Sequence, residues 1–377
     1  MSGRRLRLRE ASLGVAAVCA ATALGELGVR LDAALDAGFG QQIVALDPLS
    51  ALIEPHGDLG YRQRPGSRYH YGNGTVATSN AMAFRGPAVS LPKPPGTFRI
   101  VLLGESSTHG WGVNDDETID AYMRQVLAER YPARRFDVVN LAFDGYDAYQ
   151  QYERLRSDGV PLDPDLLIVN AGINDVRNAR FPDLQDRDAR TLLYAEILRI
   201  QREAARHGPS AWTWLKHHSY LARLPGLVRS RLGTAPAGDV RAGVTPNARA
   251  LDYFALNLGR IAALVRNRAT PIVFSTPPSA IGTHYTQHDS LARSYWLGDA
   301  ETTQRYRDSL AQRMRQLVVH LRREGQPVIY LRPELPGELF LDDCHPTAAG
   351  NRQLALDFVA AAQPFLGTGG LAARTRP

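Results

Sequence analysis

The sequence predicts an α/β protein in which about five parallel strands form the middle layer of a three-layer α/β/α sandwich. From Phe98 onward, short apolar runs alternate with longer segments in which apolar residues recur at helical spacing. This alternation is typical of a parallel sheet with right-handed crossovers and helices on both faces. We expect a flavodoxin-like sheet, preceded by an N-terminal membrane helix and a small β-rich extension.

The first expected element, residues 1–31, is an apolar helix. Arg4–Arg9 precede the apolar run Ala11–Gly25, which Glu26 interrupts. The length of this run lies between that of a signal-peptide core and that of a membrane span. The arginines favour a cytoplasmic N-terminus, with the rest of the chain outside the cytoplasmic membrane. We expect an uncleaved, single-pass signal anchor. A signal peptide cleaved after Ala23, which would release a secreted form, is the second interpretation, and a buried amphipathic helix is the third.

The second expected part is the extension, residues 32–98, which is rich in Gly, Pro and Tyr. Tyr69–Val76 surrounds a Gly-Asn-Gly turn and predicts two short strands. The proline-rich run Leu91–Gly96 then marks the boundary with the sandwich.

The sandwich itself is expected over residues 99–366. The apolar runs predict strands at Ile100–Leu103, Val138–Leu141, Leu166–Val169, Ile272–Phe274 and Val328–Leu331. Helical spacing predicts helices near Ile119–Glu129, Tyr149–Ser157, Leu251–Val265 and Tyr306–Leu321, and after Pro346. Residues 178–245 break the alternation. A helical insertion over the functional edge, a membrane-facing amphipathic patch, and helices packed on the sheet all fit this segment. Residues 367–377 are expected to be a disordered tail.

The charge distribution argues against a nucleic-acid partner. Of the net charge of +6, the first ten residues carry +3 and the tail carries +2, which leaves about +1 for everything between. The two cysteines, Cys19 and Cys344, lie in unrelated segments and cannot plausibly pair. No spacing of cysteines and histidines predicts structural zinc. We also expect neither a metal nor an organic cofactor.

Three of the expected strands are followed by groups suited to acyl-ester chemistry. Ser106 follows the first strand, where its hydroxyl and amide face a helix N-terminus. Gly145 follows the second strand and can offer an N–H that no side chain blocks. Asn174 follows the third, and its amide can donate to an oxyanion. Taken singly, each has a plainer interpretation as a helix cap, a turn glycine or an Asn turn.

A histidine with neighbouring carboxylates follows the last strand, in Asp342-Asp343-Cys344-His345. Asp342, three residues earlier in a turn, can accept from the ring Nδ1–H and leave Nε2 free to take the Ser106 proton. Asp343 is the rival acid, but adjacent side chains diverge. Because ligands of open parallel sheets bind at the carboxyl ends of the strands, we expect these groups to meet there.

These four blocks resemble those of the SGNH (GDSL-like) hydrolase superfamily from about Arg99 to Phe365. The segment Asn80–Gly86 resembles extensions of its membrane-anchored bacterial members. The resemblance implies that Ser106 is the nucleophile, His345 the base and Asp342 its orienting acid. It implies an oxyanion hole formed by the N–H of Ser106, Gly145 and Asn174. Glu105 replaces the usual aspartate before the serine; we expect this change to affect the loop and leave the activity intact.

The implied function is that of an extracytoplasmic serine esterase that removes acyl or acetyl groups from a glycan or a lipid. Two alternatives stay open: an O-acyltransferase that modifies a cell-surface polysaccharide, and a catalytically silent glycan-binding protein. His109, Trp111, Tyr146 and Arg177 are candidates for the walls of the substrate pocket, although core packing is as good an interpretation of each.

Overall fold

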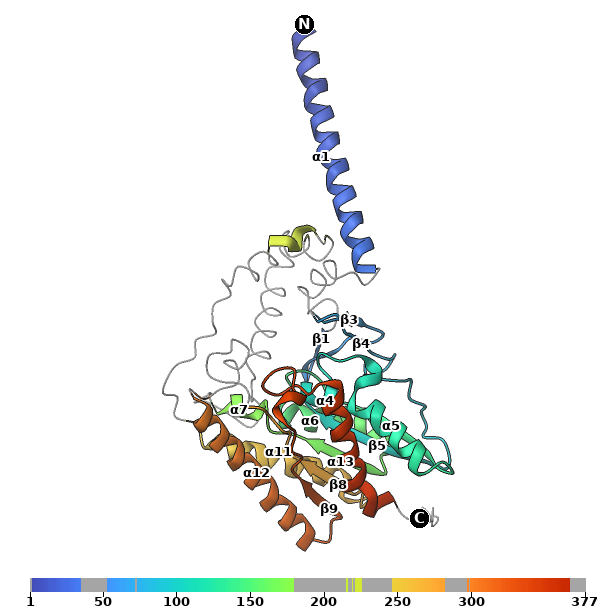
Figure 1. Cartoon of the computed structure of the whole chain (residues 1–377), viewed down its shortest axis with the longest axis vertical. Coiled ribbons are helices and arrows are strands. Elements are labelled where there is room, and N and C mark those ends of the chain that lie inside the picture. The colour runs from blue at the N-terminus through green and yellow to red at the C-terminus, as the bar shows by residue number, and fades with distance from the viewer. Residues whose placement is uncertain are drawn as a thin grey trace.

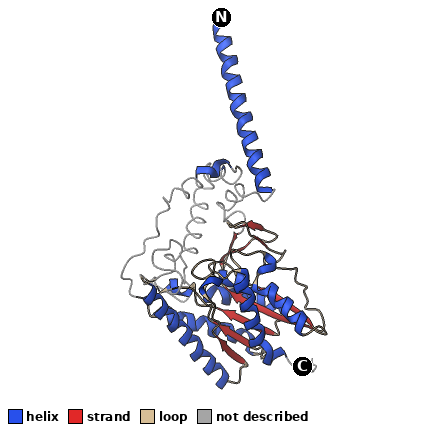
Figure 2. Cartoon of the chain, viewed as in Figure 1, coloured by secondary structure: helices blue, strands red, loops and turns tan. Residues whose placement is uncertain are grey.

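The protein is built around a five-stranded parallel sheet (Figures 1 and 2). A computed structural model describes residues 2–34, 53–71, 73–179, 215, 219, 221–225, 246–281, 297 and 299–366. The sheet has the order β6-β5-β7-β8-β9. Its strands are β5 (Thr97–Gly104), β6 (Arg135–Asn140), β7 (Leu166–Asn170), β8 (Ile272–Ser275) and β9 (Val328–Leu331). This is the strand order of flavodoxin-like sheets, so the predicted fold class is confirmed.

Helices cover both faces of the sheet, as the alternating pattern predicts (Figure 1). One face carries α5 (Ile119–Arg130) and α13 (Ala348–Leu366), and the other carries α6 (Ala148–Arg154), α11 (Arg249–Arg266) and α12 (Ala300–Arg323). Successive side chains of a strand point to opposite faces. In β5, Ile100 and Leu102 therefore pack in the α5–α13 layer, whereas Val101 and Leu103 pack in the other layer.

The helices form where apolar spacing and capping groups agree. On α11 the residues Phe254, Leu258, Ile261 and Val265 are buried and follow each other at three or four positions, which gives the helix one apolar face. Asp299 caps α12 by accepting the Thr302 N–H at 2.6 Å.

The extension consists of two antiparallel strand pairs that lie beside the carboxyl edge of the main sheet. They are β1 (Ile53–His56) with β2 (Gly60–Gln63), and β3 (Arg68–His70) with β4 (Val76–Thr78). The second pair is the hairpin that the Gly-Asn-Gly turn predicts. Arg85, downstream of it, forms isolated bridges with Ser79 and with Asn140 at the end of β6. The extension is therefore tied to the sheet.

The N-terminal helix α1 (Ser2–Ala34) points away from the sandwich (Figure 1). Within it, Gly14–Leu31 is long and apolar enough to cross a membrane, with a mean hydropathy of 1.4 and none of it buried. Near its end, Glu26 accepts hydrogen bonds from the Ser219 hydroxyl at 2.9 Å and the Leu221 N–H at 3.0 Å. Residues 35–52, most of 178–245 and the tail 367–377 lie outside the described residues, so the predictions for the insertion and the tail stay predictions.

Candidate active site

The candidate residues gather at the carboxyl ends of β5, β6 and β7. The short helix α4 (Ser106–His109) starts two residues after β5 ends at Gly104, with Glu105 between them. Gly104 is required there, because an added Cβ would lie 2.3 Å from the Thr108 hydroxyl oxygen. The sharp turn from strand to helix places Ser106 in the first helical turn, where its N–H has no intrahelical acceptor.

Ser106, His345 and Asp342 form a continuous chain of hydrogen bonds. The Ser106 Oγ lies 2.7 Å from His345 Nε2, and His345 Nδ1 lies 2.6 Å from Asp342 Oδ2. The other carboxylate oxygen, Oδ1, accepts the backbone N–H groups of Cys344 at 2.9 Å and His345 at 2.8 Å. All three residues are buried. The carboxylate is thus fixed by its own turn, and this orients the imidazole toward the serine.

The pKa values of the two adjacent aspartates of this turn are shifted in opposite directions. Burial opposes ionisation of Asp342, but the hydrogen bond and charge of His345, with the two backbone N–H groups, outweigh it and hold its pKa below the usual value. Burial and the charge of Asp342 raise the pKa of Asp343 to about 6. Its carboxylate oxygens are buried without a hydrogen-bond partner in the described part of the chain. The rival acid therefore lies away from the imidazole.

The predicted oxyanion donors lie on the neighbouring strand ends. Gly145 has a φ of +79°, a left-handed conformation that favours glycine. Among the described residues, no acceptor pairs with its N–H or with that of Ser106. Asn174, which follows β7, is fully buried, and its side-chain amide donates to the Tyr146 carbonyl at 3.0 Å. This bond ties the amide to the segment that carries Gly145.

Glu105 has a positioning role that the sequence did not reveal. Its buried carboxylate accepts the backbone N–H groups of Gly172 at 2.8 Å, Ile173 at 2.8 Å and Asn174 at 2.6 Å. The residue before the serine therefore holds the segment that presents Asn174. The glutamate that replaces the usual aspartate therefore has a structural role: its carboxylate holds the backbone of residues 172–174.

Two asparagines at strand ends hold α4 in place. Asn140, the last residue of β6, donates to the Thr108 carbonyl at 3.0 Å, and Asn170, the last residue of β7, donates to the Thr108 hydroxyl at 3.0 Å. Both asparagines are fully buried. Their position at strand ends beside the predicted site was the signal that could have identified them.

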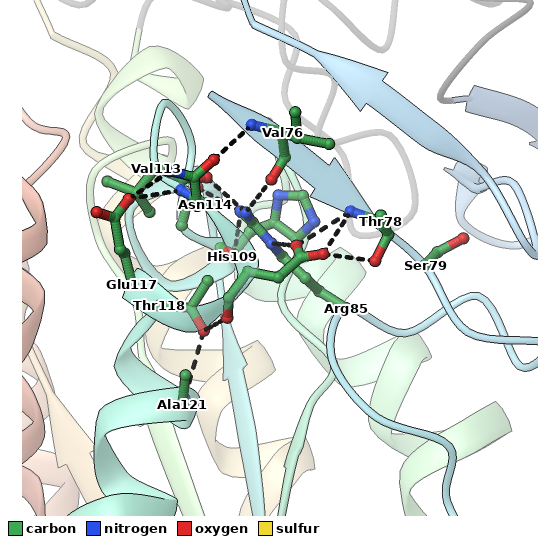
Figure 3. A network of polar contacts seen from close by, with 12 residues as sticks. Val76, Thr78, Ser79, Arg85, His109, Val113, Asn114, Glu117, Thr118 and Ala121 are labelled. Atoms are coloured by element: carbon green, nitrogen blue, oxygen red, sulfur yellow. Dashed lines mark hydrogen bonds and ion pairs between the residues drawn. The ribbon is translucent and has the colours of Figure 1, made fainter. Parts of the chain in front are cut away.

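A buried arginine of the extension holds the loop after α4 (Figure 3). The Arg85 guanidinium donates to the carbonyls of His109 at 3.0 Å, Val113 at 2.6 Å and Gly110, and it pairs with Asp115 at 3.0 Å. A planar guanidinium suits this cluster of acceptors, because its five donors point in fixed directions. The extension therefore helps to shape this loop, residues 110–114, which we call the nucleophile loop because it follows the candidate nucleophile Ser106 and α4.

The candidate pocket residues occupy different environments. Trp111 is half-buried, and its ring packs on that of His345 with the centroids 4.4 Å apart. His109 and Tyr146 have no exposed surface, so both lie inside the core and not on a pocket wall. His109 bonds Asp144, and the Tyr146 hydroxyl donates to the Tyr61 carbonyl at 3.0 Å. The side chain of Arg177 lies outside the described residues.

Asp342, Cys344 and His345 also present donor atoms within 4.8 Å of one another, a spacing that suits a metal ion. Asp342 and Ser106 already use the two ring nitrogens of His345. Burial and the charges of Asp343 and Asp342 raise the pKa of the Cys344 thiol well above its usual value, which disfavours the thiolate that a metal requires. The cluster is better explained by proton transfer than by metal binding.

Comparison with known proteins identifies the family. Residues 102–353, more than half of the chain, match the GDSL-like Lipase/Acylhydrolase family. The comparison with curated protein sequences finds no match.

Three solved structures illustrate the likeness of fold. An acetylxylan esterase from Geobacillus stearothermophilus, in the form of a catalytic mutant, is 16% identical with a TM-score of 0.40, covering 70% of this chain and 93% of that one. A GDSL-like lipase from Bacteroides thetaiotaomicron is 15% identical with a TM-score of 0.37, covering 71% and 88%. An alpha/beta hydrolase enzyme from the metagenome of Lake Arreo, Spain, is 18% identical with a TM-score of 0.38, covering 71% and 96%.

Identities and scores this low carry no argument about substrate, so membership rests on the family match. The chain belongs to the GDSL-like lipase/acylhydrolase family, and it is a serine hydrolase that acts on ester bonds.

Proposed function

We propose that the protein is a membrane-anchored esterase that cleaves an acyl group from a glycan or lipid outside the cytoplasmic membrane, through Ser106, His345 and Asp342. The observation that carries the proposal is the unbroken chain of hydrogen bonds from the Ser106 hydroxyl through His345 to Asp342, with distances of 2.7 and 2.6 Å. A serine hydroxyl becomes an effective nucleophile when a base lies within hydrogen-bond reach and an acid orients that base.

In the first half of the reaction, Ser106 Oγ attacks the ester carbonyl while His345 Nε2 takes the hydroxyl proton. The ionised Asp342 stabilises the imidazolium that forms. His345 then gives the proton to the leaving alcohol, and the acyl group stays on Ser106 as an ester.

In the second half, His345 takes a proton from water, which attacks the acyl-enzyme and releases the carboxylic acid. Ser106 recovers its proton from His345. The oxyanion of each tetrahedral intermediate is stabilised by the N–H groups of Ser106 and Gly145 and by the Asn174 amide. One such donor typically contributes about 2.7–4 kcal/mol.

The proposed location rests on α1. No residue of its apolar window Gly14–Leu31 is buried in the structure, as expected for a helix surrounded by lipid. The arginines before this window favour an N-terminus in the cytoplasm, which leaves the hydrolase domain on the other side. Protease digestion of intact spheroplasts tests this: the domain should be degraded without lysis, and protection of the domain would contradict the topology.

The activity is tested with the full chain in detergent, on p-nitrophenyl acetate and on longer acyl esters. We expect hydrolysis by the wild type and loss of at least about 10³-fold in kcat for Ser106→Ala, whose fold should be intact. Equal, slow hydrolysis by both would refute the esterase. If acyl groups moved only when a glycan acceptor replaced water, the enzyme would be an O-acyltransferase with the same residues.

A further inference from the structure

We propose that Asp144, Tyr69 and Trp111 form a subsite that binds a neutral sugar ring carrying the ester. This inference rests on the proposed esterase function and adds the class of the alcohol. Asp144 immediately precedes the candidate oxyanion donor Gly145, whereas Tyr69 comes from the extension and Trp111 from the loop after α4.

Asp144 is an oriented carboxylate with one oxygen left over. Its Oδ1 lies 2.9 Å from His109 Nδ1, and its main-chain carbonyl accepts the Tyr61 hydroxyl at 2.7 Å. His109 Nε2 is buried with no partner among the described residues, so Asp144 is the hydrogen-bond partner of this ring. In the same part of the chain, Oδ2 of Asp144 has no hydrogen-bond partner, and 17% of the side chain is exposed.

Asp144 carries a negative charge that interacts with the imidazoles of His109 and His345. Burial opposes ionisation, but the charge and hydrogen bond of His109, with the nearby charges of His345 and Arg85, outweigh it and hold the pKa of Asp144 below the usual value. The hydrolytic mechanism assigns this carboxylate no proton to carry. An ionised acceptor close to the oxyanion donors works against the developing negative charge unless a substrate donor pairs with it.

A row of aromatic rings runs from the extension to His345. The centroids of Tyr69 and Tyr71 are 5.1 Å apart, those of Tyr71 and Trp111 are 5.6 Å apart, and those of Trp111 and His345 are 4.4 Å apart. Tyr69 packs against the cluster that contains Tyr61 and Phe143; Phe143 directly precedes Asp144, and the Tyr61 hydroxyl donates to the Asp144 carbonyl. This packing brings the row close to Asp144, and burial with the charge of Asp144 raises the pKa of Tyr69 to about 12. Tyr69 and Trp111 are the partly exposed members.

Aromatic faces beside an ionised acceptor suit a sugar more than a lipid. The faces pack on the C–H surface of a ring, and the carboxylate accepts a hydrogen bond from a ring hydroxyl next to the ester. A triacylglycerol or a diacyl phospholipid has no free hydroxyl beside its esters, and an anionic sugar would be repelled by the Asp144 charge. The alcohol that fits best is therefore a neutral sugar with a free hydroxyl beside the ester.

The proposal is tested by comparing three substrates of the full chain in detergent: p-nitrophenyl acetate, a monoacetylated methyl xyloside and a monoacetylated methyl galacturonide. The wild type should prefer the xyloside to the anionic galacturonide. In Asp144→Asn, kcat/KM on the xyloside relative to p-nitrophenyl acetate should fall about 10- to 100-fold, as expected for a lost hydrogen bond to a charged acceptor. The rate on the galacturonide relative to the xyloside should rise.

Asp357→Asn is the matched control, because among the described residues the side chain of Asp357 bonds Gln353 on α13 alone. Tyr69→Leu provides a second variant and should lower the same ratio. If Asp144→Asn reduced the rates on all three substrates alike, Asp144 would act through the triad and the subsite would be refuted. Unchanged ratios in both subsite variants would refute it as well.

A binding measurement separates this inference from the proposed activity. Saturation-transfer NMR on Ser106→Ala detects the unacetylated methyl xyloside without any turnover. Binding that is lost in the double variant Ser106→Ala, Asp144→Asn supports the subsite even if the wild type hydrolyses no ester, in which case only the esterase fails. No binding to Ser106→Ala would refute the subsite even if the ester activity is present.

Discussion

The role of Glu105 gives the sharpest test of how the oxyanion donors are held. Replacing Glu105 with glutamine keeps the shape of the side chain but turns one acceptor oxygen into an NH2 group. The carboxylate accepts three N–H groups, from Gly172, Ile173 and Asn174, at 2.6–2.8 Å. Whichever way the amide turns, at least one of these buried donors faces another donor and loses its acceptor.

The magnitude follows from the cost of that lost acceptor. A buried donor left without a partner costs about 1–3 kcal/mol. If the segment shifts to give this donor a new partner, Asn174 moves away from the oxyanion and the activation free energy rises by a similar amount. That rise corresponds to about a 5- to 150-fold lower kcat. Complete loss of one oxyanion donor, about 10²–10³-fold, is the upper bound. KM for a small ester should change little, because the ground-state carbonyl gains little from the donor.

The assay is steady-state hydrolysis of p-nitrophenyl acetate by Glu105→Gln, with thermal unfolding to show that the variant is folded. A fluorophosphonate probe counts the reactive serines, so that a lower kcat is not mistaken for a smaller active fraction. Glu153→Gln is the matched control. Glu153 is a mostly buried glutamate near the end of α6, and its carboxylate pairs with the exposed Arg156 just after that helix. A folded Glu105→Gln with the kcat of the wild type would refute the positioning role.

Three further outcomes are expected. Asp342→Asn should lower kcat about 10⁴-fold in the ester assay, because an amide no longer holds the His345 ring in the required tautomer; a loss below about 10-fold would exclude Asp342 as the orienting acid. Asp343 has a folded pKa of about 6 against 3.8 in the unfolded chain, so the unfolded state binds fewer protons between these values and stability falls as the pH rises through them. At about 1.36 kcal/mol per pKa unit, ionisation of Asp343 lowers the unfolding free energy of the wild type by about 3 kcal/mol. In thermal unfolding, Asp343→Asn should therefore lose less stability than the wild type between pH values of about 4 and 7. Equal losses would contradict this. Arg85→Met should lower the unfolding free energy by about 3–5 kcal/mol, because it leaves Asp115 and several buried carbonyls without their donor; Arg99→Met, which removes another buried arginine far from α4, tells whether a loss of activity is specific to the nucleophile loop.

The sequence predicted what depends on local order along the chain. Ser106, Gly145 and Asn174 each come within five residues of the end of an apolar strand. Parallel strands bring their carboxyl ends to one edge, so the convergence of these residues could be expected. The hydrogen bond between His345 and Asp342 joins residues three positions apart in one turn. The strands and helices are confirmed for the same reason, since apolar period and length define them.

The sequence did not predict what depends on distant contacts. Arg85 reaches carbonyls 24 to 28 residues away, and Tyr146 bonds the Tyr61 carbonyl 85 residues away. His109 and Tyr146 were candidates for the pocket because they flank the motifs. The direction of each side chain, however, is set by how α4 and the loop around Gly145 pack against the extension. No periodicity in the sequence encodes that packing.

The hydrogen bonds from Arg85 to the nucleophile loop determine how much of the chain an active fragment must include. The family match starts at residue 102. Arg85, whose guanidinium bonds the carbonyls of His109 and Val113, lies upstream of that start. A fragment that begins at residue 102 would keep Ser106, Asp342 and His345 but would lack Arg85, which holds the loop after Ser106. Recombinant fragments that lack α1 should therefore start before β1, and fragments that start after Arg85 should be inactive because the loop after Ser106 has lost its support.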